Sequence, residues 1–158
     1  MPATIGCWML PEVRPGGAPY PVTVEVVGSE TPAADALTLG VALAASADRV
    51  GLLVMGDGSA ALTPKAPRYV VEGAKEWQRS VDQALGSADI EALAALSDDD
   101  ARRYWATGRV AWQVLAGAAR AGEKPGMAWR ATLLAAEAPY GVGYTVAAWE
   151  RVTMSESP

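Results

Sequence analysis

Apolar and polar positions change pattern several times along the first third of the chain. Residues 3–10 and 22–27 are short apolar runs with β-branched members, and residues 49–55 are apolar at nearly every position, so each run predicts a strand. A continuous apolar run of this kind is typical of a strand buried on both faces of a sheet that helices cover. Thr31-Pro32 supplies an N-cap and a first helical position, which predicts a helix over 32–46.

Helical spacing dominates the part of the chain after the third apolar run. Three helices are expected, and the last of them should break near Gly108. Ser87 is the predicted N-cap of the second helix. The expected ranges are 72–85, 87–96 and 98–121.

Two further apolar segments, 127–139 and 140–150, predict strands that are joined at Ala138-Pro139. Strand, helix and strand followed by a helical stretch and two closing strands favour an α/β sheet over a helical bundle. The sequence therefore predicts one α/β domain over residues 1–152. We expect an open, mostly parallel sheet flanked by helices, with a helical insertion and closing strands at the C-terminus. Residues 153–158 are expected to form a disordered tail.

Charge and cysteine content narrow the function classes. The net charge is −5 and the basic residues are scattered singly, which argues against nucleic acid or an anionic membrane as a partner. The single cysteine, Cys7, cannot form an internal disulfide. The sequence shows no signal peptide, and no apolar stretch approaches the roughly 20 residues that span a bilayer. A cytoplasmic location is expected.

The absence of histidine removes most familiar chemistry. The 158-residue chain contains no His, so a Ser-His-Asp or Cys-His nucleophile system cannot be built from its own residues. Zinc sites of the usual Cys/His kind and the iron site with two histidines and one carboxylate are excluded for the same reason. Any catalysis by this chain alone would have to use other side chains.

The turn Gly56-Asp57-Gly58-Ser59 directly follows the apolar run at 49–55. In open α/β folds, ligands bind at the carboxyl edge of the sheet, so this turn is a candidate binding or catalytic edge. Glycines also permit a sharp corner, and a purely structural turn explains them equally well. A phosphate loop is excluded because Lys65 is followed by Ala66-Pro67 and not by Ser or Thr.

Three stretches in order, LLVMGDGSAALTPKAPRYV, GRVAWQVLAGAA and EAPYGVGYTVAAW, carry a resemblance to a known family. They are similar to the C-terminal two thirds of actinobacterial proteins that resemble the B-type polypeptide of class III extradiol ring-cleavage dioxygenases. The resemblance covers roughly residues 36–150. It implies an α/β fold in which two histidines and one carboxylate hold a non-haem Fe(II) that cleaves catechol-type rings with O₂.

Departures from the family decide what the resemblance implies for chemistry. Its N-terminal His-Pro strand, which supplies an iron ligand, has no counterpart here, and Ser59-Ala60-Ala61 stands where active relatives carry a histidine. Glu137, close to Pro139 and Tyr140, is the candidate for the third ligand position. One carboxylate cannot hold catalytic iron alone. We therefore expect no catalytic residue, no bound metal and no cofactor.

Three hypotheses remain open. The favoured one is a catalytically degenerate relative that keeps a pocket for a small, aromatic ligand or acts by self-association as a homo-oligomer. The alternative is an interaction or structural subunit completed by a partner chain that supplies the missing iron ligands. A third is an enzyme that uses the carboxylate of Asp57 with Lys65. The expected pocket residues are Gly56, Asp57, Gly58, Ser59, Lys65, Glu137, Tyr140 and Tyr144.

Overall fold

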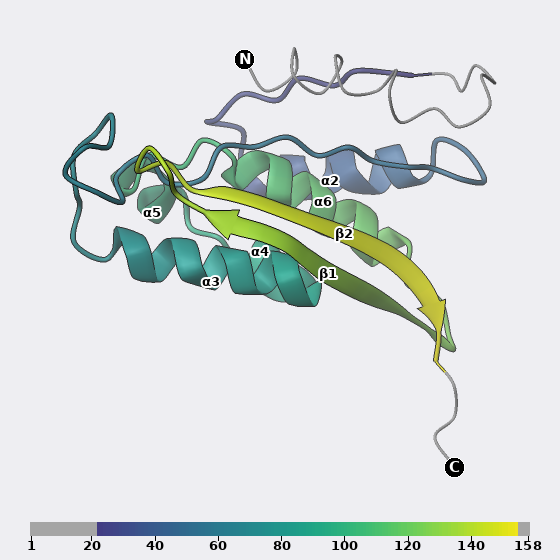
Figure 1. Ribbon diagram of the computed structural model, residues 1–158. Coiled ribbons are helices and arrows are strands. Elements are labelled where there is room, and N and C mark those ends of the chain that lie inside the picture. The colour runs from purple at the N-terminus through teal and green to yellow at the C-terminus, as the bar shows by residue number, and fades with distance from the viewer. Residues whose placement is uncertain (1–21, 155–158) are drawn as a thin grey trace.

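The computed structural model describes residues 22–154, so the strand expected over 3–10 and the tail from residue 155 onward lie outside it. The described chain is a mixed α/β fold in which five helices precede one β-hairpin (Figure 1). The elements in chain order are α2 (Ala33–Ala44), α3 (Ala74–Ser87), α4 (Ile90–Ala94), α5 (Asp98–Arg103), α6 (Arg109–Ala121), β1 (Met127–Glu137) and β2 (Tyr144–Thr153).

The helix expected over 32–46 is confirmed as α2, but its cap differs from the prediction. Pro32 occupies the N-cap position and no side chain caps the helix. The Pro32 carbonyl accepts hydrogen bonds from the amides of Asp35 and Ala36, at 3.1 and 3.0 Å. Thr31 lies one residue outside the helix, because the fixed φ of proline already sets the chain direction there.

The remaining helices follow the predicted pattern with one cap corrected. Ser87 does not cap α4, because it is the last residue of α3 and its hydroxyl donates to the carbonyl of Gln83 at 2.9 Å. Asp89 takes the cap position, and its Oδ1 accepts from the amide of Ala92 at 2.9 Å. The predicted break near Gly108 is confirmed, since α5 ends at Arg103 and Gly108 is the N-cap of α6.

The two closing strands are confirmed as an antiparallel hairpin whose paired residues run from Met127 opposite Thr153 to Glu137 opposite Tyr144. Two tryptophans attach the hairpin to the helices. The indole N–H of Trp129 donates to the carbonyl of Ala119 on α6 at 3.0 Å. That of Trp149 donates to the carbonyl of Leu85 on α3 at 2.7 Å.

The core lies between the helices and one face of the hairpin. Its main cluster joins α3, α4 and α6 around Val81, Leu93 and Trp112, and Trp129 and Trp149 pack against it. Helices α2 and α6 approach closely through facing glycines. A Cβ on Gly117 would lie 2.1 Å from the carbonyl oxygen of Leu37, so this helix contact requires glycine.

The strands expected over 22–27 and 49–55 are not strands in the structure. Among the described residues, the sheet contains β1 and β2 alone, so a mostly parallel sheet is not present. The prediction of burial at 49–55 is wrong: Val50, Leu52 and Leu53 are 39%, 39% and 48% exposed. An apolar run specifies that burial is favourable, but a strand also needs a partner for its backbone groups.

Both segments nevertheless contact the helices at single positions. Val27 packs against the cluster of α2 and α6, and Val54 packs against the main core cluster. In Figure 1 both segments are drawn as irregular chain above the helices. None of the helices in the described part is long and apolar enough to span a membrane.

Candidate functional site

The glycine turn is a point where three parts of the backbone meet. The amide of Gly58 donates to the carbonyl of Gly143 at 3.2 Å, and the amide of Gly143 donates to the carbonyl of Ser59 at 2.9 Å. On the other side, the amide of Gly108 donates to the carbonyl of Asp57 at 2.8 Å. The turn therefore ties the start of α6 to the end of the hairpin loop.

Glycine is required here because the backbones lie too close for a side chain. A Cβ on Gly58 would lie 2.5 Å from the carbonyl oxygen of Gly143, and one on Gly56 would lie 2.8 Å from the Cα of Gly108. Such distances are below any ordinary van der Waals contact. The structural interpretation of this turn explains both of its glycines without a ligand.

Ser59 is fully buried and its polar atoms are occupied by the protein. Its hydroxyl donates to the carbonyl of Tyr104 at 2.7 Å and accepts from the amide of Ala61 at 3.2 Å. Its own amide donates to the side-chain oxygen of Gln78 at 2.8 Å. Ser59 is placed as an internal connector between the turn, helix α3 and the end of α5, and it faces no pocket.

Four other predicted pocket residues point to solvent. Asp57 and Lys65 are exposed, and within the described chain they form no ion pair with each other. Tyr140 and Tyr144 are 74% and 48% exposed. The structure therefore does not bring these four side chains together with Ser59.

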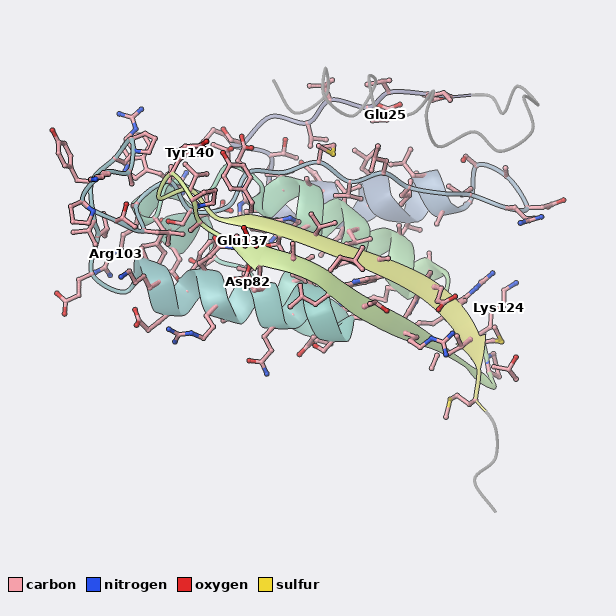
Figure 2. All side chains as sticks on the ribbon, viewed as in Figure 1. Glu25, Asp82, Arg103, Lys124, Glu137 and Tyr140 are labelled. Atoms are coloured by element: carbon pink, nitrogen blue, oxygen red, sulfur yellow. The ribbon has the colours of Figure 1, made fainter. Side chains whose placement is uncertain are left out.

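Glu137 alone among the predicted side chains lines a groove. The groove has a volume of about 270 Å³ and lies between helix α3 and the end of β1. Figure 2 shows Asp82 and Glu137 on these two elements. The polar side chains that line it are Thr63, Lys75, Gln78, Arg79, Asp82 and Glu137.

Asp82 is the best-held side chain of this groove. Its Oδ1 accepts hydrogen bonds from the side-chain amide of Gln78, at 2.8 Å, and from the hydroxyl of Thr145 on β2. Gln78 in turn accepts from Ser59, so the polar contacts run from the glycine turn through α3 to the hairpin. The sequence prediction missed Lys75, Gln78, Arg79 and Asp82. Their spacing of three and four residues, which places them on one helix face, was the available signal.

A second polar cluster, also missed, is centred on Arg109 at the start of α6. Its guanidinium is 3% exposed, lies 2.6 Å from the carboxylate of Asp98 and donates to the carbonyls of Ser29 and Thr31 at 2.9 and 3.0 Å. It also donates to Gln113, whose amide donates to the carbonyls of Ala94 and Leu96. Every contact is internal, so this cluster positions three loops and presents no group to a ligand.

A larger groove of about 580 Å³ lies at the far end of the hairpin, around the connection between α6 and β1. Figure 2 shows Lys124 at this end and Glu137 at the other. Three charged side chains line the larger groove, Glu123, Lys124 and Arg151, of which Arg151 donates to the carbonyl of Gly122 at 3.0 Å. None of the predicted site residues belongs to it.

The residues present do not fit the iron site that the family resemblance implies. The chain has no histidine to supply two of the three ligands. Glu137, the proposed third ligand, shares its groove with Asp82 but also with the cations of Lys75 and Arg79. Within residues 22–154 no three His, Cys, Asp or Glu side chains come close enough to hold a metal ion.

Comparisons of this chain with known protein families, with curated proteins and with solved structures find no match.

Proposed function

We propose that the protein is a catalytically silent relative of the class III extradiol dioxygenases and that it acts by self-association in the cytoplasm. One observation carries the proposal: many large apolar side chains are exposed in three stretches of the described chain. They are Val22, Val24, Val26, Val50, Leu52, Leu53, Leu133, Leu134, Tyr144 and Val146. Single exposed apolar residues are ordinary, but contiguous ones favour a protein interface.

The glycine turn supports the same choice. A ligand-binding protein would need an open pocket at this turn, whereas the backbones of Gly56 and Gly58 are packed against Gly108 and Gly143. Ser59, the only hydroxyl of the turn, is fully buried and hydrogen-bonded within the protein. The hydroxyl and the close-packed backbone of this turn stabilise the fold and leave no room for a substrate between them.

The proposal includes a wider sheet than the hairpin. The apolar segments 22–27 and 49–55 stand on either side of α2 in the chain, as two parallel strands and their connecting helix do. Val27 and Val54 already contact the helices. We propose that these segments belong to an open, partly parallel sheet when a second copy covers their exposed side chains.

A small-molecule pocket is the second candidate function, and the groove beside Glu137 is the observation in its favour. Its cations and carboxylates would suit a small ligand that carries both charges, because each charge would meet its opposite. A small aromatic ligand, as expected from the sequence, is less well matched, since the groove is lined by four charged side chains.

Two measurements on the purified chain test the proposal. Sedimentation velocity over a hundredfold dilution should show a dimer that dissociates at low concentration. Oxygen uptake with added Fe(II) and a catechol should equal that of Fe(II) and catechol without protein. A monomer at every concentration would overturn self-association. Protein-dependent oxygen uptake would overturn catalytic silence and return the partner-completed or iron-dependent hypotheses.

A further inference from the structure

We infer that the chain self-associates through the outer edge of β1, which pairs antiparallel with β1 of a second copy. This inference rests on the proposed self-association and names the surface that performs it. In the described chain β1 pairs with β2 on one side only. The backbone groups on its other side form no hydrogen bonds with any other described element.

The centre of this edge has none of the features that keep sheet edges apart. Natural edge strands are commonly protected by proline, by charged side chains or by their short length. Strand β1 is 11 residues long, contains no proline and is uncharged from Ala131 to Ala136. Leu133 and Leu134, at its centre, are 44% and 63% exposed. An open, apolar edge of this length is a template for a further strand.

The bulge in β1 selects one register for a symmetric pair. Leu133 lies opposite Ala147 and Ala135 lies opposite Val146, so Leu134 has no partner on β2. The extra residue shifts the alternation of faces, and Arg130 and Glu137 consequently share a face: their partners Glu150 and Tyr144 are six residues apart on an unbroken strand. A twofold pair can therefore place Arg130 opposite Glu137 of the second copy.

In this register the positions on either side of the bulge are matched in face and in charge. Leu133 meets Leu134 of the second copy at the centre, and Thr132 meets Ala135. At each end, Arg130 of one copy meets Glu137 of the other, and the symmetry repeats the contact. Opposite charges directly across an antiparallel pair are stabilising, so two equivalent ion pairs would close the interface.

Both charged residues are free to make the contact. Arg130 uses Nε and Nη2 to hold Glu150 of its own chain, at 3.0 and 2.7 Å, and Nη1 has no partner among the described residues. Glu137 is exposed and forms no ion pair within the described chain. A guanidinium can bind a second carboxylate with the remaining nitrogen.

Charge reversal in two separate chains tests the register. A chain with Arg130→Glu carries acids at both positions, and a chain with Glu137→Arg carries bases at both. Each variant alone should dimerise about tenfold more weakly or worse, because both ends then place like charges opposite each other. An equimolar mixture should recover a 1:1 heterodimer by native mass spectrometry, since every Glu then faces an Arg. Glu123→Arg, away from the strand, is the matched charge control.

A second pair of variants covers the possibility that Arg130→Glu unfolds the hairpin beside Glu150. Leu134→Lys should abolish dimerisation, whereas Leu53→Lys, also at an exposed apolar position, should not. Dimerisation of all the β1 variants at the wild-type concentration would overturn the inference and leave self-association intact. A wild-type chain that is monomeric throughout would overturn the proposed function itself.

Discussion

Gly58 and Gly143 lie in backbone contact: the amide of Gly58 donates to the carbonyl of Gly143 at 3.2 Å, and a Cβ on Gly58 would lie 2.5 Å from that oxygen. The two residues are far apart in sequence, and their contact holds the turn after the apolar run 49–55 against the start of β2. This contact gives the glycine turn a structural role.

Gly58→Ala should therefore destabilise the fold strongly. The added methyl group cannot fit unless one backbone moves, and overpacking of this kind costs about 1–3 kcal/mol or more. Gly51→Ala is the matched control, because a Cβ there meets nothing within 4 Å. Urea unfolding of both variants measures the difference. Equal stability of the two would show that the close contact does not exist in solution.

Ser59→Ala should also destabilise the protein. The substitution leaves the buried carbonyl of Tyr104 and the amide of Ala61 without the hydroxyl that serves both. An unsatisfied buried polar group costs about 1–3 kcal/mol. Ser80→Ala is the control, since the Ser80 hydroxyl bonds the carbonyl of Trp77 on an exposed part of α3. If Ser59→Ala unfolds at the wild-type urea concentration, Ser59 has no structural role.

Arg109→Met should destabilise the fold by about 3 kcal/mol, because removing a buried cation leaves its partners without a counter-charge and hydrogen bonds. Asp98, partly exposed, loses its ion pair, and the carbonyls of Ser29 and Thr31 lose their donor. Arg49→Met, at an exposed position, should change the free energy of unfolding by less than about 0.5 kcal/mol. Comparable losses for the two variants would contradict the internal role of Arg109.

The loop before α2 has a second, exposed connection to α5 that should matter much less. Hydrogen bonds to the carboxylates of Asp99 and Glu30 raise the pKa of Arg102 above its ordinary value, so its charge persists at all pH values of interest. All three side chains are exposed, and exposed ion pairs contribute little. Arg102→Met should leave thermal unfolding nearly unchanged in high salt, and a large loss there would contradict this ranking.

Local patterns predicted the local structure well. Helices α2, α3 and α6 and the closing hairpin follow from apolar spacing, and the break at Gly108 follows from one glycine. The strands at 22–27 and 49–55 failed because pairing depends on distant parts of the chain, which periodicity does not specify. The same reason hid the partner of Gly58 and the contacts of Arg109.

The candidate site was predicted only in part. Glu137 was identified from its place before Pro139 and Tyr140, and it does line a groove. Its neighbours on α3 were missed because charges at helical spacing are also typical of an ordinary solvated face. Tyr140 and Tyr144 were expected in the pocket, but the turn of the hairpin directs them to solvent.

The central claim is that the chain associates with itself and does so without iron. Light scattering and elemental analysis on one purified sample test both halves together. We predict a molar mass of twice 16.4 kDa and no stoichiometric metal. A monomer of 16.4 kDa that carries one iron per chain would contradict the claim.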